Sequence, residues 1–250
     1  MFKFEKLIFG DLGWGDEFLI ATLMTIIVSI CSMGLGIFIA IFAAWAKLTY
    51  NKFLKFIASF YTTVVRGIPE LLVIYLIFFG GSAVVMKIAK VFGYTGYIEL
   101  NAFTISVIAI GIISATYSTE VLRAAFLSID RGQIEAAKTL GLSKFQIFYK
   151  ILVPQVLRHA IPGLGNVWQV TLKDTSLISV TGLVEIMRQT RISSNVEHSP
   201  LTFLITAAFL YLFLTTFSGK FFNYLERQSN IGFVQTSLIF LNFSILFKKV

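Results

Sequence analysis

Long uncharged runs of hydrophobic residues alternate with short charged stretches along most of this chain. An α-helix needs about 20 apolar residues to cross the hydrocarbon core of a bilayer. Four runs approach or exceed that length, and a further run is weaker because Lys173 and Asp174 interrupt it. The predicted spans are residues 18–46, 68–85, 103–122, 161–184 and 201–222. The pattern predicts an all-α integral membrane protein with about five transmembrane helices.

The first run also has a feature of a secretory signal peptide, since residues 44–46 read Ala-Trp-Ala, a small-x-small pattern. However, acidic residues precede it (Asp11, Asp16 and Glu17), whereas signal peptides begin with basic residues. The run is also about twice as long as a usual signal core. We therefore expect residues 18–46 to be a retained helix.

The last apolar stretch, residues 231–247, contains Asn and Gln and is short for a membrane span. We therefore expect three regions along the chain. Residues 1–17 form an N-terminal arm, residues 18–227 form the transmembrane domain, and residues 228–250 form an atypical apolar tail.

Composition supports a membrane protein. Hydrophobic residues make up 56% of the chain and charged residues only 14%, whereas soluble domains carry about 25% charged residues. This excludes a cytosolic enzyme, a nucleic-acid-binding module and a disordered chain. Two thirds of the 21 Lys and Arg residues fall in alternate loops, so the positive-inside rule places the N-terminus outside and the C-terminus in the cytoplasm. The net charge of +8 then reports topology and attraction to anionic lipid.

The residues that carry chemistry in enzymes are scarce. One Cys and two His exclude an intrachain disulfide and an N/S metal cage. The phosphate-binding motif GxxxxGK[ST] is absent, because Phe follows the only Gly-Lys pair, Gly219–Lys220. We expect a chain with no catalytic site, no metal and no bound cofactor.

The long third loop, on the predicted cytoplasmic side, shows the clearest local signals. Asp130 and Gln133 have capping-box spacing, so a helix should start near Arg131. Gly141 suits the turn that ends it, and Ser143 with Gln146 should start a second helix. The resulting helix–glycine turn–helix has an apolar face, which suits either a groove on another protein or the lipid surface.

Two carboxylates lie inside the apolar runs, where a charge usually faces a cavity or a partner. Glu70 follows Pro69, which interrupts a helix; it either faces a translocation path for a cationic substrate or pairs with Arg66 at i−4. We expect Glu120 to pair with Arg123 at i+3.

Lys173 and Asp174 interrupt the weak span. They line the same cavity or, as we slightly prefer, mark a helix end near the outer interface. The hypothesis of a substrate path therefore includes Glu70, Pro69, Arg66, Glu120 and Asp174.

Residues 135–137 read Glu-Ala-Ala, and Gly141, Ile151 and Pro154 follow at fixed spacing. This pattern resembles the EAA loop of the membrane subunits of bacterial ABC importers, although Val153 stands where Leu is usual. Other motifs resemble the polar amino acid branch, in particular the histidine/arginine/ornithine and opine permeases. They are RGIPEL at 66–71, YSTE at 117–120, PGLGN at 162–166, WQVTLK at 168–173 and LER at 225–227.

The resemblance covers residues 18–227 and implies a type I importer permease of five or six helices in the bacterial inner membrane. It implies a dimer with itself or a sister permease, two ATPase subunits that bind ATP and Mg, and a periplasmic binding protein for polar, basic amino acids or opines. The helix at about 131–154 is then the coupling helix that docks on the ATPase. By resemblance, its functional residues are Glu135, Ala136, Ala137, Gly141, Ile151 and Pro154.

Two other classes of function compete with this interpretation. An ATP-independent channel or secondary carrier predicts paired internal repeats and buried proton-relay residues, and we find no clear repeat. A non-transporting scaffold would use the loop only to recruit a soluble partner.

Overall fold

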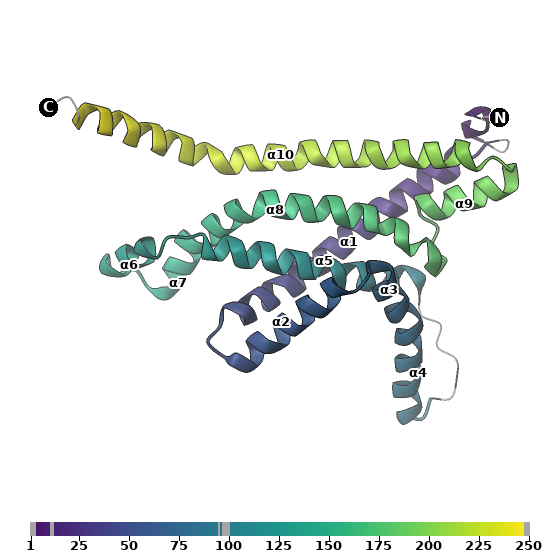
Figure 1. The fold of residues 1–250 in the computed structure, drawn as a ribbon, viewed down its shortest axis with the longest axis horizontal. Helices are drawn as coiled ribbons and strands as arrows, with labels where there is room; N and C mark the ends of the chain where they lie inside the picture. The colour runs from purple at the N-terminus through teal and green to yellow at the C-terminus, as the bar shows by residue number, and fades with distance from the viewer. Residues whose placement is uncertain (1–3, 11–12, 95, 97–100, 248–250) are drawn as a thin grey trace.

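The computed structural model describes residues 4–10, 13–94, 96 and 101–247, and side chains within these ranges from residue 5 to residue 229. The elements of the described part are all helical and extend into an elongated bundle (Figure 1). They are η1 (Phe4–Leu7), α1 (Gly15–Leu48), α2 (Lys52–Gly67), α3 (Glu70–Tyr75), the π-helix η2 (Leu76–Gly80), α4 (Gly81–Val91), α5 (Ala102–Leu127), α6 (Arg131–Thr139), α7 (Lys144–Ile147), the π-helix η3 (Phe148–Leu152), α8 (Val153–Asp174), the 3₁₀ helix η4 (Thr175–Thr181), α9 (Ile186–Glu197) and α10 (Pro200–Phe247).

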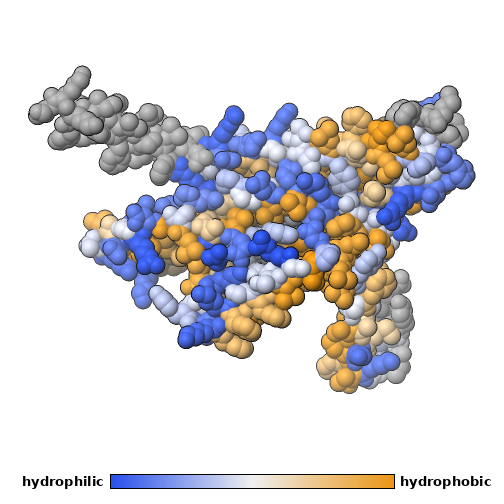
Figure 2. All heavy atoms as spheres, in the orientation of Figure 1, coloured by the Kyte–Doolittle hydropathy of each residue, from blue (hydrophilic) through white to orange (hydrophobic). Residues whose placement is uncertain are grey.

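Four helices of the described part are long and apolar enough to cross a membrane. They are Gly15–Leu48, Glu70–Val91, Ala102–Leu127 and Pro200–Ser229. The all-helical membrane fold predicted from the sequence is confirmed, and each of the four strong runs corresponds to one of these helices, although the run 68–85 begins two residues before its helix. Figure 2 shows apolar residues exposed over much of the visible face, with hydrophilic residues at the ends of the bundle and also across its middle.

The weak predicted span, residues 161–184, was placed wrongly along the chain. Its helix, α8, covers residues 153–174 instead of 161–184, and it is not among the four helices that meet the apolar criterion. The helix ends at Asp174 because the chain tightens into the 3₁₀ helix η4 and then turns at Gly182, which has a φ of 92°. The helix end that we expected at Lys173–Asp174 is confirmed.

The boundary expected between the transmembrane domain and the tail falls within a continuous helix. α10 runs without a break from Pro200 to Phe247, so residue 228 lies inside a helix. Residues 248–250, and the side chains of residues 230–247, lie outside the described part.

Helices α1 and α5 cross closely at small residues. A Cβ atom added to Gly36 would lie 2.9 Å from the Oγ atom of Ser114, and one added to Gly111 would lie 2.9 Å from Cδ2 of Leu35. Backbones approach this closely only where side chains are small, which is the usual basis of helix association in membranes.

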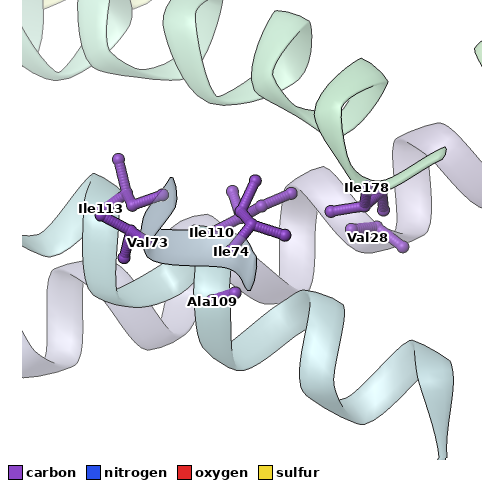
Figure 3. Packing of buried hydrophobic residues seen from close by; sticks show 7 residues of the cluster. All are labelled: Val28, Val73, Ile74, Ala109, Ile110, Ile113 and Ile178. Carbon is purple, nitrogen blue, oxygen red and sulfur yellow. The ribbon is translucent and has the colours of Figure 1, made fainter. Parts of the chain in front are cut away.

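A buried apolar cluster packs α3 and η4 against the crossing of α1 and α5 (Figure 3). It joins α1, α3, α5 and η4 through Val28, Val73, Ile74, Ala109, Ile110, Ile113 and Ile178. The start of α3 and the segment after Asp174 are therefore held against the same core.

Candidate functional site

The structure gathers most of the predicted functional residues into two places, and Glu120 lies apart from both. One is the loop that joins α5 to α8, which lies with α6 and α7 at one end of the bundle, opposite α9 (Figure 1). The other is the start of α3, next to the end of α8.

Helix α6 begins where the sequence predicted, but its cap differs. The Oδ1 atom of Asp130 accepts a hydrogen bond from the backbone N–H of Gly132 at 2.8 Å. The predicted capping box is incomplete, because the side chain of Gln133 binds elsewhere. Its Oε1 atom accepts from Nε2 of Gln155 at 2.7 Å, which ties α6 to the base of α8.

The glycine turn and the second cap are confirmed. Gly141 has a φ of 77°, a left-handed conformation that costs glycine little. Ser143 and Gln146 form a complete capping box, with the Gln146 N–H donating to Ser143 Oγ at 3.3 Å and the Ser143 N–H donating to Gln146 Oε1 at 2.9 Å. The helix–glycine turn–helix of residues 131–152, which we call the knob, is therefore defined by its own local chemistry.

The second helix of the knob is not regular. After four residues of α7 the chain widens into the π-helix Phe148–Leu152. Pro154 follows at the start of α8. In a regular helix the proline ring would press against the carbonyl of residue 150, and the wider turn relieves this contact. The knob thereby continues into α8 without a loop.

The knob exposes large apolar side chains. Leu140 is 80% exposed and Phe145 73%, and the ring of Phe145 stacks on Tyr149 with centroids 6.0 Å apart. Of the residues singled out by resemblance, Ala137 is buried and Ile151 is half-buried, whereas Glu135, Ala136, Gly141 and Pro154 are exposed. Such a surface suits a groove on a partner protein.

The second place is built around Glu70. The hydroxyl of Tyr117, in α5, donates a hydrogen bond to Glu70 Oε1 at 3.0 Å. The guanidinium of Arg66 lies 5.2 Å from the centroid of the same tyrosine ring, a cation–π distance. The alternative ion pair between Arg66 and Glu70 is not found among the ion pairs of the described residues. Sequence reasoning missed Tyr117 as the residue that joins the two.

Asp174, at the end of α8, interacts with the carboxyl group of Glu70. We call these two residues the acidic pair. Two neighbouring carboxylates repel each other, so the place favours a bound cation or a shared proton. Within the described ranges no cluster of three or more His, Cys, Asp or Glu residues gathers to hold a metal ion. The negative charge of two adjacent carboxyl groups attracts a cationic group.

Glu120 belongs to a different network. Its Oε2 atom accepts from Arg123 Nε at 2.9 Å, which confirms the predicted pair, and its Oε1 atom accepts from Lys47. The Lys47 ammonium also donates to Thr62 Oγ1 at 2.5 Å. These contacts join α1, α2 and α5, and none of the described contacts links Glu120 to the acidic pair.

Comparison with known proteins places the chain among transport proteins. Residues 36–230 match the family described as binding-protein-dependent transport system inner membrane component. The chain is 48% identical over 224 residues to the nopaline transport system permease protein NocQ of Agrobacterium fabrum, covering 89% of this chain and 95% of that protein. It is 34% identical over 226 residues to the histidine/lysine/arginine/ornithine transport system permease protein HisQ of Escherichia coli, covering 90% of this chain and 99% of that protein.

Solved structures agree with this placement. The chain is similar, with a TM-score of 0.73 and 30% identity, to a structure described as an amino acid ABC transporter with histidines. The match covers 86% of this chain and 95% of that one. An inward-facing MetNI methionine ABC transporter shares the fold with a TM-score of 0.67 at 16% identity, covering 85% of this chain and 95% of that one.

Proposed function

The chain belongs to the family of binding-protein-dependent transport system inner membrane components, and from this premise we propose that it imports basic amino acids or opines. It is a permease subunit of the ABC importer class. The observation that carries the proposal is the exposed, capped knob at one end of a bundle with four apolar spans, in a chain that matches the family over residues 36–230.

The knob is the proposed docking element for a separate ATPase. Glu135 and Ala136 are exposed on α6, and Gly141 allows the chain to reverse so that Phe145 lies on the second helix. ATP and Mg bind to that partner in this proposal, and this chain holds neither. Ala137 is buried in the knob and Ile151 is half-buried, and Pro154 follows the knob in the first turn of α8.

The acidic pair is the proposed contact for the substrate. A guanidinium, ammonium or imidazolium group placed between Glu70 and Asp174 would relieve the repulsion between the two carboxyl groups. Tyr117 holds Glu70 in place by its hydrogen bond, and Arg66 lies on the tyrosine ring. Pro69 immediately precedes α3 and places Glu70 in its first turn. The contacts of Glu120 support a structural role instead, next to the path.

The orientation of the bundle in the membrane decides where the remaining partners bind. The end with the knob faces the cytoplasm of a bacterium, in agreement with the basic loops, and the end with η1 and α9 faces the periplasm. A periplasmic binding protein docks at the α9 end, and a second permease, either another copy or a sister subunit, completes the path in the inner membrane.

Transport then proceeds by alternating access. Closure of the ATPase dimer on ATP brings two knobs together, and the membrane helices rearrange so that the path opens to the periplasm. Because a ligand shifts an equilibrium only through a difference in affinity, ATP must bind preferentially to the state with the knobs together.

The test is uptake by proteoliposomes that contain this chain together with the ATPase and the binding protein of its importer. We expect accumulation of arginine or octopine that requires both ATP and the ATPase, and we expect the ATPase to copurify with the chain. Uptake without the ATPase would indicate a channel or secondary carrier. Copurification of the ATPase without any uptake would indicate a scaffold.

A further inference from the structure

Glu185 is a buried carboxylate that neither the knob nor the acidic pair uses. It lies between η4 and α9 and has 0% exposure. An ionisable side chain buried in a membrane domain is costly, and it persists where partners and a role compensate the cost. The three groups that donate to it identify this role.

Two of the three donors belong to α9. The side chain of Glu185 caps that helix, because it accepts from the backbone N–H groups of Met187 at 2.7 Å and Arg188 at 2.6 Å. The third donor comes from another helix. The hydroxyl of Tyr211, in α10, donates to Glu185 Oε2 at 3.0 Å. Glu185 thus joins the start of α9 to the N-terminal part of α10.

The same hydroxyl reaches the end of α8. The Tyr211 hydroxyl oxygen lies 3.5 Å from Oγ1 of Thr175, which is fully buried and is the next residue after Asp174. A second contact holds the far end of η4, since Arg188 Nη1 donates to the carbonyl oxygen of Ser179 at 3.1 Å. Glu185 therefore binds the two residues that contact this segment, Tyr211 beside Thr175 and Arg188, whose side chain binds the carbonyl of Ser179.

We infer that Glu185 is a positioning residue that holds Asp174 against Glu70, acting through Tyr211 and Thr175. The inference rests on the proposed function, because it assigns Glu185 a part in the contact with the cationic substrate. Glu185 does not touch that substrate. It sets the separation of the two carboxyl groups, and through that separation the affinity for a guanidinium.

Two mild substitutions remove the hydrogen bond between Tyr211 and Glu185. They keep the aromatic ring at position 211 and the cap of α9. Tyr211→Phe keeps the packed ring and removes the hydroxyl. Glu185→Asp keeps the charge and a residue suited to a helix cap, and shortens the side chain so that it no longer reaches Tyr211. Because both changes break the same hydrogen bond, the double variant should be no worse than either single variant. Tyr50→Phe makes the same chemical change at a fully exposed tyrosine and is the control.

The first measurement reads the position of residue 174 and does not depend on any substrate. Glu70→Cys and Asp174→Cys are combined in a Cys31→Ser background, and the rate of disulfide formation under a mild oxidant is followed in the purified complex with the ATPase. We expect Tyr211→Phe and Glu185→Asp to slow the reaction by roughly three- to tenfold, the effect of one hydrogen bond. Equal rates in these variants and in Tyr50→Phe would overturn the inference.

The second measurement is arginine binding to the same complex with both carboxylates intact and without the binding protein. We expect each link variant to raise the Kd by roughly three- to tenfold, with no further loss in the double variant. Additive losses would overturn the inference. If the wild-type complex binds no arginine while the disulfide rate still responds, the cationic substrate is wrong and the positioning role of Glu185 stands.

Discussion

A substitution of Glu70 gives the most direct test of the proposal that the acidic pair binds a cationic substrate. Glu70→Gln keeps an oxygen that accepts from Tyr117 and removes the charge that faces Asp174. We expect uptake of arginine to fall about tenfold or more, because the substrate loses one partner of a desolvated charge pair. Uptake of glutamine, which carries no side-chain charge, should change little.

The control for this experiment is Glu17→Gln, which makes the same change at an exposed position on α1. Arginine and glutamine uptake are measured in the same proteoliposomes. An equal loss for both amino acids, or no loss for either, would contradict a role for Glu70 in charge selection.

Glu120 supports a prediction about stability. Glu120→Gln leaves the Lys47 side chain, which is 10% exposed, without its charged partner. We expect the free energy of unfolding to fall by about 1–3 kcal/mol, because a largely buried cation loses its compensation. Arg123→Gln should cost less, since the Arg123 side chain is 38% exposed and water screens its pair.

Thermal unfolding of the purified protein in detergent ranks these two variants. Similar midpoints for Glu120→Gln and Arg123→Gln would show that Lys47 gains little from the carboxylate. Arginine uptake per folded molecule should be unchanged in both, and a selective loss of arginine uptake would instead place Glu120 on the path.

Residues whose partners lie near in sequence could be predicted, and residues with distant partners could not. Glu70 and Asp174 stood out because a charge inside an apolar run is visible in the sequence, and the Glu120–Arg123 pair follows from helical spacing. Tyr117 is 47 residues from Glu70, so no local pattern joins them. Glu185 lies immediately after the weak apolar run and resembles a loop charge, although its side chain is fully buried.

At the scale of elements, hydrophobic length predicted the strong spans but not α8. The run 18–46 corresponds to Gly15–Leu48 and the run 103–122 to Ala102–Leu127, because membrane helices extend a few residues beyond their apolar parts. The first turns of α8 carry Arg158 and His159, so the apolar pattern begins eight residues after the helix does. The π-helix before Pro154 could not be predicted, since a proline there equally favours a break.

Gly141 gives a prediction for the knob. Gly141→Ala adds a Cβ atom that meets nothing within 4 Å, so the only cost is the left-handed backbone with its φ of 77°. That cost is about 1–2 kcal/mol. We expect the turn to open in part of the population, which should weaken binding of the ATPase and lower ATP-dependent uptake by roughly tenfold.

Gly34→Ala is the matched control, because its Cβ atom also meets nothing within 4 Å and its backbone is helical. Copurification of the ATPase with each variant is compared at equal amounts of permease in the membrane. Full binding and uptake in Gly141→Ala would show that the turn tolerates another conformation.

For the whole molecule, one helix joins the two functional places. α8 begins at Val153, directly after the knob, and ends at Asp174 in the acidic pair. Its 22 residues span about 33 Å at 1.5 Å per residue. In the proposed mechanism a displacement of the knob reaches the acidic pair along this helix, which continues through Pro162, while Gln133 ties α6 to the base of the same helix. The amides of Gln133 and Gln155 keep the knob from swinging independently of α8.

This arrangement predicts that a substitution on the exposed face of the knob weakens binding of the ATPase and leaves the folding of the permease unchanged. Ala136 is exposed on α6, next to the buried Ala137. Ala136→Leu should fold normally, because the added side chain points to solvent in the free subunit. In the proposed complex with the ATPase, the larger side chain has to fit into a closely packed contact, where overpacking costs about 1–3 kcal/mol. We expect ATPase binding to weaken by roughly tenfold or more and ATP-driven uptake to fall with it, at unchanged permease levels.

Lys144→Leu is the control, since it also adds an apolar side chain to an exposed position of the knob but replaces a solvated cation. Both variants are assayed for copurified ATPase, arginine uptake and unfolding temperature. If Ala136→Leu kept the ATPase and lost only uptake, α6 would transmit movement without forming the contact. If it kept both, the partner would bind another face, and the link through α8 would not carry the force of ATP binding.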